Sequence, residues 1–410
     1  MNLSRLFTSH DIKEAFQRLK RKRFKKGLEE FSRFSQRKSD ALNGLGRYLK
    51  STDRQKYYSN LKDFQFFPYQ GIKIQKGKDK QGRIKYRPLL VPQAKDRIVL
   101  AAAFPKIRNL LKKELARYLA LGLGLGAQED ISECQKTLSD IKNQLKENRY
   151  VLKLDFKDFF STIDRKILLK KLKPFFKSKN DQLFRLIKKS ISNSIEANPD
   201  FWGTFQHLDL RRKGIPQGLS YSPLLASFYA LSLDKVSDKV KGCKSYRYLD
   251  DMIVLAKNEK VIKQAYKFIN KESKKIKLIL HPLQKEGSKT KLVDIESEQF
   301  EFLGICLSKT HSLIPNEAIT EFKTRFEQEI LNKRTISQFS LKKLIEVFKN
   351  FAGGWSNYYQ TLCPEDYSKV QGEMDQYLMH YIESKKRRKK FFGDLRLKLQ
   401  KPFIKLAETF

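Results

Sequence analysis

Cysteine and histidine are scarce in this 410-residue chain, and their positions exclude several kinds of site. The four cysteines lie too far apart for a Cys-x-x-Cys motif or a zinc knuckle; they are Cys134, Cys243, Cys306 and Cys363. The five histidines, His281 among them, show no metal-ligand spacing either. We therefore expect reduced and mostly buried thiols, and any metal chemistry must depend on carboxylates.

Long apolar runs are also missing from the sequence. No stretch approaches the roughly 20 consecutive apolar residues that a membrane-spanning helix needs, and no signal peptide is recognisable at the start. These absences predict a soluble protein of the cytoplasm.

Acidic residues are too few to balance the basic ones. The chain has 85 Lys and Arg against 45 Asp and Glu, a formal net charge of +40 that is spread along the whole sequence. Solubility alone does not require such an excess, which indicates a polyanionic partner. We predict salt-sensitive binding of nucleic acid, with a merely solvated basic surface as the alternative.

Two adjacent carboxylates begin a strand-like apolar segment. Asp250 and Asp251 follow Tyr248 and Leu249 and precede the apolar residues 252–255. Because neighbouring carboxylates repel each other and resist burial, they are costly unless a cation lies beside them. An ordinary exposed turn is the alternative for an isolated Asp-Asp pair.

Two segments upstream give this pair a context. Residues 151–154 alternate in polarity like a strand that places Asp155 at its C-terminal end. Residues 214–224 form a turn rich in Gly and Pro, and the apolar run 224–233 that follows is predicted to be helical. A strand with one Asp, a glycine-rich turn into a helix and a Tyr-x-Asp-Asp hairpin, in this order, closely resemble the palm of reverse transcriptases.

Motifs on both sides extend the resemblance to prokaryotic reverse transcriptases, including those of group II introns, over about residues 65–360. Residues 85–92 are similar to a basic fingers strand. Downstream, residues 288–290 and 300–305 resemble the last palm motif and the primer-grip hairpin. Residues 353–359 resemble the Gly-Trp-x-Asn-Tyr-Tyr element of the thumb.

The resemblance implies an α+β right-hand polymerase with fingers, a palm built on an antiparallel sheet, and a helical thumb. We predict a basic helical N-terminal extension over residues 1–60, fingers over 61–150, a palm over 151–305, and a helical thumb with a basic C-terminal tail over 306–410.

In the predicted thumb, Gly353 and Gly354 are expected to terminate a helix. The aromatic residues Trp355, Tyr358 and Tyr359 either stack on bases or pack the thumb core. Core packing is the favoured interpretation for Trp355.

The resemblance makes Asp155, Asp250 and Asp251 the catalytic residues. Joining a nucleotide to a 3′-hydroxyl requires stabilising the attacking oxygen and the leaving pyrophosphate, which two divalent ions roughly 3.5–4 Å apart can do. Hard oxygen ligands suit Mg²⁺, with Mn²⁺ as an alternative ion. By resemblance, Asp155 and Asp250 bridge the two ions, Asp251 lies nearby, and the backbone carbonyl of Phe156 is a further ligand.

A second set of residues is assigned by resemblance to the incoming nucleotide. Phe160 matches the aromatic residue that lies under the sugar and leaves no room for a 2′-hydroxyl, with core packing as the alternative. Gln217 and Gly218 would lie against the nascent base pair, where glycine allows close backbone approach. The cations matched to the triphosphate and pyrophosphate are Lys80, Arg87, Arg97 and Lys289.

Nucleic-acid contacts are predicted at Tyr248, at Gly304 in the primer-grip hairpin, and in a terminal basic block that contains Lys386, Arg387 and Arg388. Because this block would repel itself unless anions neutralise it, RNA binding is its favoured role. The implied partners are an RNA template, dNTPs and a DNA product. We expect a dedicated noncoding RNA as the template, and a homo-oligomer or a partner protein stays open.

The biological role is less constrained by the sequence. The turn Gly-Leu-Ser-Tyr-Ser-Pro and the Tyr-Leu-Asp-Asp box look more like domesticated bacterial enzymes that defend against phage than like the commoner group II forms. Retron signatures are absent, and little room is apparent for the maturase and DNA-binding regions of group II intron proteins. We therefore expect a defence-associated reverse transcriptase. A retron or intron-type mobile-element enzyme, template-independent or protein-primed synthesis, and an inactive RNA-binding scaffold remain alternatives.

Overall fold

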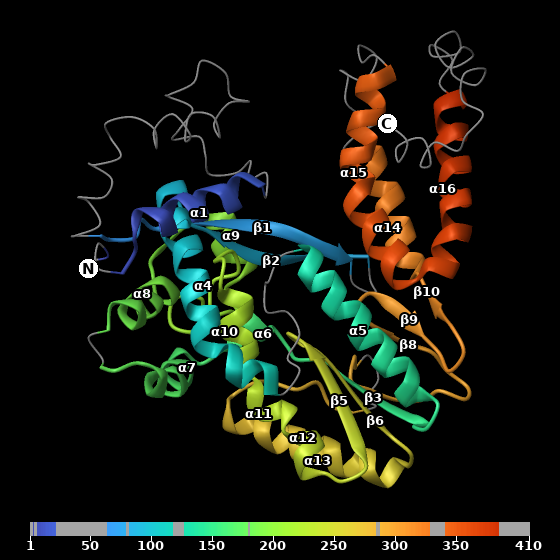
Figure 1. Cartoon of the computed structure of the whole chain (residues 1–410), viewed down its shortest axis with the longest axis horizontal. Helices are drawn as coiled ribbons and strands as arrows, with labels where there is room; N and C mark the ends of the chain where they lie inside the picture. Colours follow the sequence, from blue (N-terminus) through green and yellow to red (C-terminus); the bar gives the residue numbers. More distant parts are fainter. Residues whose placement is uncertain are drawn as a thin grey trace. The chain divides into compact units, whose positions relative to one another are not determined.

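The computed structural model describes residues 3, 6–21, 64–78, 82–117, 127–178, 181–283, 288–328 and 341–384, which form a mixed helix-and-sheet fold (Figure 1). The chain divides into two compact units. The first comprises Met1–Gly126, Leu152–Val254 and Glu259–Lys291, and the second comprises Ala127–Val151, Leu255–Asn258 and Leu292–Phe410.

Two long antiparallel strands, β1 (Tyr69–Lys78) and β2 (Ile84–Val91), belong to the first unit. β1 also pairs with the short parallel strand β4 (Ile195–Glu196), so the strand order is β2-β1-β4. The first half of β2, through Arg87, is exposed, whereas most of its second half is buried. The basic strand predicted over residues 85–92 is therefore confirmed.

Helix α4 (Ala94–Arg117) follows this hairpin and packs against α1 (Ser9–Arg21). Ile12 of α1 is buried, as the apolar periodicity of the N-terminal segment predicts. The sequence also has a basic run at residues 20–26 and a glycine-rich segment at residues 121–126. The structure describes only the first two residues of the basic run, at the end of α1, and none of the glycine-rich segment.

A four-stranded sheet with the order β5-β6-β3-β7 carries the predicted catalytic segments. Its strands are β5 (Cys243–Tyr248), β6 (Asp251–Ala256), β3 (Tyr150–Leu154) and β7 (Lys291–Asp294). Residues 252–256 of β6 are all fully buried, with 0% exposure. Both strands expected from the sequence, the one before Asp155 and the one after Asp250, are present.

Short helices complete the first unit. They are α6 (Phe159–Thr162), α7 (Arg165–Leu172), the 3₁₀ turn η3 (Lys173–Phe175), α8 (Gln182–Ile191), α9 (Pro199–Thr204), α10 (Ser222–Tyr229), α11 (Leu231–Asp234), α12 (Val236–Lys239) and the longer α13 (Glu259–Lys275). The apolar run 224–233 is helical as predicted, but divided between α10 and α11. Asp164 caps α7 as its position before Arg165 predicts, because its carboxylate accepts from the backbone N–H groups of Lys166 (2.9 Å) and Ile167 (3.0 Å).

The second unit combines one small sheet with helices. Its elements are α5 (Ala127–Leu145), β8 (Phe300–Phe302), β9 (Ile305–Leu307), β10 (Ser312–Leu313), α14 (Asn316–Phe326), α15 (Leu341–Leu362) and α16 (Pro364–Ser384). The sheet has the order β10-β9-β8, and α15 packs against both α5 and α16. The four cysteines are not joined in disulfide bonds, and Cys134 and Cys363 are buried in this unit.

Aromatic residues hold these helices together. The ring of Trp355 lies 4.8 Å from the rings of both Phe322 and Tyr359 and 6.2 Å from that of Tyr367, measured between centroids. Core packing of Trp355 is therefore confirmed. The helix end predicted at Gly353-Gly354 is wrong, because α15 continues through both glycines to Leu362. The aromatic contacts on either side stabilise this helix enough to overcome the low helix propensity of glycine.

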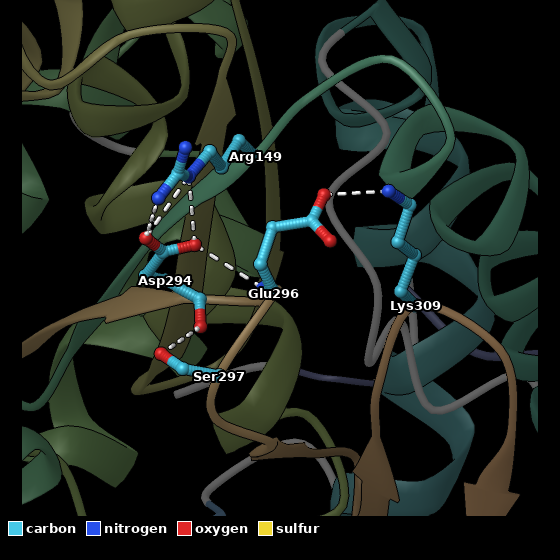
Figure 2. A network of polar contacts seen from close by, with 5 residues as sticks. All are labelled: Arg149, Asp294, Glu296, Ser297 and Lys309. Atoms are coloured by element: carbon cyan, nitrogen blue, oxygen red, sulfur yellow. Dashed lines mark hydrogen bonds and ion pairs between the residues drawn. The ribbon is translucent and has the colours of Figure 1, made fainter.

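A polar network anchors the chain next to β3 and β7 (Figure 2). Arg149, which precedes β3, donates from Nε and Nη2 to the carboxylate of Asp294 at 2.6–3.0 Å. The hydrogen bonds from Arg149 hold the pKa of Asp294 below its usual value. The backbone N–H of Glu296 donates to the same carboxylate (3.1 Å), and Lys309 pairs with Glu296 at 2.5 Å. A bidentate pair of this kind fixes orientation as well as distance.

Within the described ranges, no helix has both the length and the apolar character that crossing a bilayer demands.

The exposed glycines of α15 allow a stability test. A Cβ added at Gly353 or Gly354 would meet no atom within 4 Å, so each Gly→Ala change should raise the free energy of unfolding by roughly 0.5–1 kcal/mol. Gly304 has a φ of +67°, so Gly304→Ala should destabilise the protein instead. Urea unfolding of the three single variants checks this. A loss of stability in both helix variants would contradict the position of these glycines inside a helix.

Candidate active site

The turn between β5 and β6 carries the adjacent carboxylates. Leu249 has a φ of +58°, in the left-handed region that non-glycine residues adopt infrequently and at some energetic cost. Asp250 and Asp251 follow it directly, and both are half-buried. Something in the surrounding structure must therefore stabilise the backbone at Leu249.

The side chain of Arg247 provides that stabilisation. It is fully buried, and it donates from Nε (2.8 Å) and Nη2 (2.5 Å) to the two carboxylate oxygens of Asp234 in α11. Its Nη1 donates to the carbonyl oxygen of Leu249 (3.0 Å), and its Nη2 also donates to the carbonyl oxygen of Ser227 in α10 (3.0 Å). One guanidinium thus ties the strained turn to two helices. We name Arg247 and Asp234 the buried clamp.

Asp155 lies directly after β3 and is held through its backbone and its side chain. Its N–H donates to Oγ1 of the buried Thr290 (3.2 Å), and its carbonyl oxygen accepts from the N–H of His281 (3.0 Å). The Oδ2 atom of Asp155 also lies 3.3 Å from Nε2 of His281. The sequence indicated no role for His281 and placed Thr290 only within the segment that resembles the last palm motif, because their partner is more than a hundred residues away along the chain.

Asp155 and Asp250 influence each other electrostatically. Burial raises the pKa of Asp250, and the negative charge of Asp155 adds to this increase, while Lys76 and Lys289 oppose it. Asp155 follows β3, Asp250 precedes the neighbouring strand β6, and the electrostatic effect of Asp155 on Asp250 places the two carboxylates near each other. Lys289, predicted to lie near the leaving pyrophosphate, is exposed and close enough to act on this site.

The fit to a divalent cation rests on this pair. In the part of the chain that the structure describes, no group of three or more His, Cys, Asp or Glu side chains is arranged to hold a metal ion. Asp155 and Asp250 are nevertheless two hard oxygen donors whose mutual repulsion a cation would relieve. Phe156 pairs with Leu280 through an isolated backbone bridge, and its side chain is buried.

The glycine-rich turn 214–218 docks on two other predicted nucleotide elements. The N–H of Ile215 donates to the carbonyl oxygen of Phe160 (2.9 Å). On the other side, the N–H of Leu90 in β2 donates to the carbonyl oxygen of Gln217 (2.8 Å). Gly218 has a φ of +140°, and a Cβ there would lie 2.3 Å from the carbonyl oxygen of Leu90, so only glycine fits.

Arg165 holds the segment that leads into this turn, a role that sequence reasoning did not find. Its guanidinium donates at 2.7–2.8 Å to four backbone carbonyl oxygens, those of Leu210, Arg211, Lys213 and Gly214. No local sequence signal marks this residue, because all four acceptors lie more than forty positions downstream.

The other predicted nucleotide residues have different surroundings. Arg87 is exposed on β2 opposite Ile74. Arg97 is only 8% exposed, and its Nε donates to the carbonyl oxygen of Pro92 (2.9 Å). Phe160 is half-buried with its ring edge-on to Phe159. Lys80 lies outside the described residues, as do Lys386, Arg387 and Arg388.

The predicted primer-grip hairpin lies in the second unit. Leu303 and Gly304 both have positive φ, which is typical of a tight turn between antiparallel strands such as β8 and β9. Tyr358 and Tyr359 of α15 donate their hydroxyl groups to the carbonyl oxygens of Leu303 (2.5 Å) and Gly304 (3.2 Å), respectively. These tyrosines therefore fix the hairpin turn.

Comparison with protein families identifies the chain. The family model described as reverse transcriptase (RNA-dependent DNA polymerase) matches residues 74–307, more than half of the chain and all of the site built around Asp155 and Asp250. The chain belongs to the reverse transcriptase family. Its fold is the right-hand polymerase fold that the sequence motifs predict. A second model, the group II intron maturase-specific domain, matches residues 323–399. The expectation that the chain has little room for a maturase region is therefore wrong.

Individual relatives are more distant. The putative COX1/OXI3 intron 1 protein of Saccharomyces cerevisiae is 25% identical over 219 residues, which are 52% of this chain and 22% of that protein. Among solved structures, telomerase from Candida albicans in complex with a telomeric RNA fragment has a TM-score of 0.44 and 12% sequence identity. The matched region covers 86% of this chain and 66% of the telomerase chain. Apo telomerase from Candida tropicalis has a TM-score of 0.39 and 14% sequence identity, and the matched region covers 83% of this chain and 66% of the telomerase chain. The chain thus spans about a fifth of its intron-encoded relative.

The buried clamp predicts two separable effects. Arg247→Ala should cost about 3–5 kcal/mol of stability, because it leaves the Asp234 carboxylate buried and unpaired. Replacing both partners, as Arg247→Met with Asp234→Leu, should restore most of that stability. The double variant should still incorporate nucleotides about tenfold to a hundredfold more slowly, because the carbonyl oxygen of Leu249 has lost its donor and the adjacent carboxylates shift. Denaturant unfolding and primer extension measure the two effects. Wild-type extension by the double variant would restrict the clamp to a folding role.

Proposed function

We propose that this protein is an RNA-directed DNA polymerase that extends a 3′-hydroxyl with deoxynucleotides. The observation that carries the proposal is the convergence of Asp155 and Asp250 at one end of β3 and β6, within a chain of the reverse transcriptase family. A carboxylate that is buried beside another carboxylate is destabilised unless a cation is bound, and this cost is expected of a site that has a catalytic purpose.

The catalytic carboxylates hold the metal in this proposal. Asp155 and Asp250 bind Mg²⁺ through their side chains, with Asp251 beside them and the backbone carbonyl of Phe156 as a further ligand. Bound divalent ions supply charge stabilisation for the attacking hydroxyl and the leaving pyrophosphate. The clamp holds the Asp250 turn in place, while Thr290 and His281 hold Asp155.

The nucleotide lies between the fingers strands and the carboxylates. Arg87, exposed on β2, contacts the triphosphate, and Lys289 neutralises the leaving pyrophosphate; Lys80 and Arg97 remain proposed additional cations. Gln217 and Gly218 lie beneath the nascent base pair, supported by the hydrogen bond from Leu90. The carbonyl oxygen of Phe160 accepts a hydrogen bond from the same turn, and its ring excludes a 2′-hydroxyl. Tyr248 and Gly304 contact the primer and template strands.

RNA is the proposed template, and DNA is the product. The net charge of +40 supports a nucleic-acid partner, and the basic block with Lys386, Arg387 and Arg388 is proposed to add phosphate contacts. One proposed biological setting is antiphage defence, in which the protein copies a dedicated noncoding RNA. A second proposed setting is that of an intron-type reverse transcriptase, which the match to the maturase-specific domain supports at least as strongly as the first. Sequencing the RNA that copurifies with the protein distinguishes these settings, because an intron-type enzyme should retain its own intron RNA.

The metal site is tested by neutralising the turn. Asp250→Asn with Asp251→Asn should reduce incorporation by several orders of magnitude in Mg²⁺ while RNA affinity stays within about twofold, because these charges serve the ions and do not contact phosphates. The matched control is Asp238→Asn with Glu298→Gln, which removes two charges at exposed positions. Primer extension and filter binding measure the outcomes. Wild-type incorporation by the Asp250/Asp251 variant would falsify the assignment.

Sugar selection is tested at Phe160. Phe160→Ala should open space for the 2′-hydroxyl and raise ribonucleotide incorporation relative to deoxynucleotide incorporation by at least about tenfold, since steric exclusion is lost. The ratio of kcat/KM values for the two substrates on one primer–template measures this. If a folded Phe160→Ala variant kept the wild-type ratio, Phe160 would be a packing residue only.

A further inference from the structure

Helix α13 carries a stripe of lysines that the proposed catalytic site does not use. The stripe comprises five exposed side chains, those of Lys260, Lys263, Lys267, Lys271 and Lys274. At 3.6 residues per turn they fall within an arc of about 80° and extend along roughly 20 Å of the helix axis. We name these residues the α13 lysine stripe.

The opposite face of α13 is the packed one. Its buried residues are Ile262, Ala265, Ile269 and Ser273, and the helix contacts α11, α12 and β5. In Figure 1, α11, α12 and α13 lie together beside β5. The centres of the buried face and of the lysine stripe are about 155° apart around the axis, so the lysines project away from the core of the unit.

Neighbouring acidic groups do not neutralise the stripe. Lys263 pairs with Glu259 at 2.8 Å, and Glu272 pairs with Lys275, which lies beside the stripe. Among the residues that the structure describes, no ion pair involves the side chains of the other four stripe lysines. Exposed Lys239 and Lys241 extend the basic surface, because the loop after α12 approaches Val261 at the start of α13.

Solubility does not explain this arrangement. Lysines three or four positions apart on a helix repel each other, whereas alternating Glu and Lys would give an equally soluble and more stable helix. The stripe therefore carries a cost in stability that the fold does not require. A ligand that supplies a row of negative charges would remove the repulsion.

We propose that the α13 lysine stripe binds the phosphate backbone of a structured RNA outside the catalytic site. The inference rests on the proposed function, because RNA is the polyanion that an RNA-copying enzyme binds. Each lysine places one charge about 5 Å along the axis from the next, so the row tracks a strand of phosphates without reading bases. The first turn of α13 lies beyond the far end of β6, about 20 Å from Asp250 along the strand. The chain after α13 returns to Asp155 at His281, but the stripe lysines lie on the face of the helix away from its buried residues.

The test removes the four unpaired charges together. The stripe variant changes Lys260, Lys267, Lys271 and Lys274 to Gln. The matched control changes four exposed lysines of α4 and α7 to Gln, which gives the same net charge; they are Lys112, Lys113, Lys166 and Lys170. Binding of the full chain to an RNA hairpin is measured over a salt series, together with primer extension on a short preformed primer–template.

For the stripe variant, we expect the slope of log affinity against log salt to fall by about 3 to 4, and affinity near 0.1 M salt to drop tenfold or more. The control should change far less. Primer extension at saturating template should stay within twofold of wild type. The melting temperature should be unchanged or raised, because like-charge repulsion has been removed, so lost binding cannot be attributed to unfolding.

Four outcomes of these measurements would overturn the proposal. Equal losses in the stripe and control variants would mean that total charge alone matters, and unchanged hairpin binding would leave the stripe a solvated face. Loss of extension in parallel with hairpin binding would assign these lysines to the catalytic groove. Weaker binding to anionic phospholipid vesicles with normal hairpin binding would indicate a membrane surface instead. Failure of the wild-type protein to extend any primer would count against the proposed function, whereas the hairpin measurements concern the stripe alone.

Discussion

The arrangement of the candidate active site depends on one buried guanidinium. Arg247 has no exposed surface, so its charge must be compensated inside the protein, and Asp234 provides that compensation. The donors that Asp234 does not use hold the carbonyl oxygens of Leu249 and Ser227. The position of Asp250 therefore follows from charge compensation in the core, since removing either partner would leave an unpaired charge and release the turn.

A second constraint connects the elements assigned to the nucleotide. The turn 214–218 accepts a hydrogen bond from β2 at Gln217 and donates one to Phe160, and Arg165 fixes the carbonyl oxygens of Lys213 and Gly214 at its start. The turn 214–218, Phe160 and strand β2 are thus joined by backbone hydrogen bonds, whose geometry varies little. A change in any one of these elements is transmitted to the others.

Local patterns in the sequence predicted the elements well. The strands next to Asp155 and Asp251, the strand with Arg87 and the Asp164 cap follow from alternation and capping rules that act over a few residues. The helix end at Gly353-Gly354 was predicted wrongly, because aromatic packing from distant residues outweighed glycine's propensity. Contacts between residues far apart in the sequence, such as Arg165 with the 210–214 carbonyls or His281 with Asp155, have no local signature. The clamp was missed for a related reason: Arg247 is visible beside Tyr248–Asp251 in the sequence, but Asp234 is recognisable as its partner only in the fold.

The complete burial of residues 252–256 of β6 has a consequence for how this site can vary in evolution. Residues 252–256 have no exposed surface, so both faces of the strand are committed to neighbours. Inserting or deleting one residue in this strand would turn every following side chain to the opposite face of the sheet. Otherwise it would move the charged Asp251 side chain into the part of the strand that has no contact with solvent. Length changes should therefore be absent from this strand among functional descendants. The number of residues between the carboxylates and the buried core is therefore fixed.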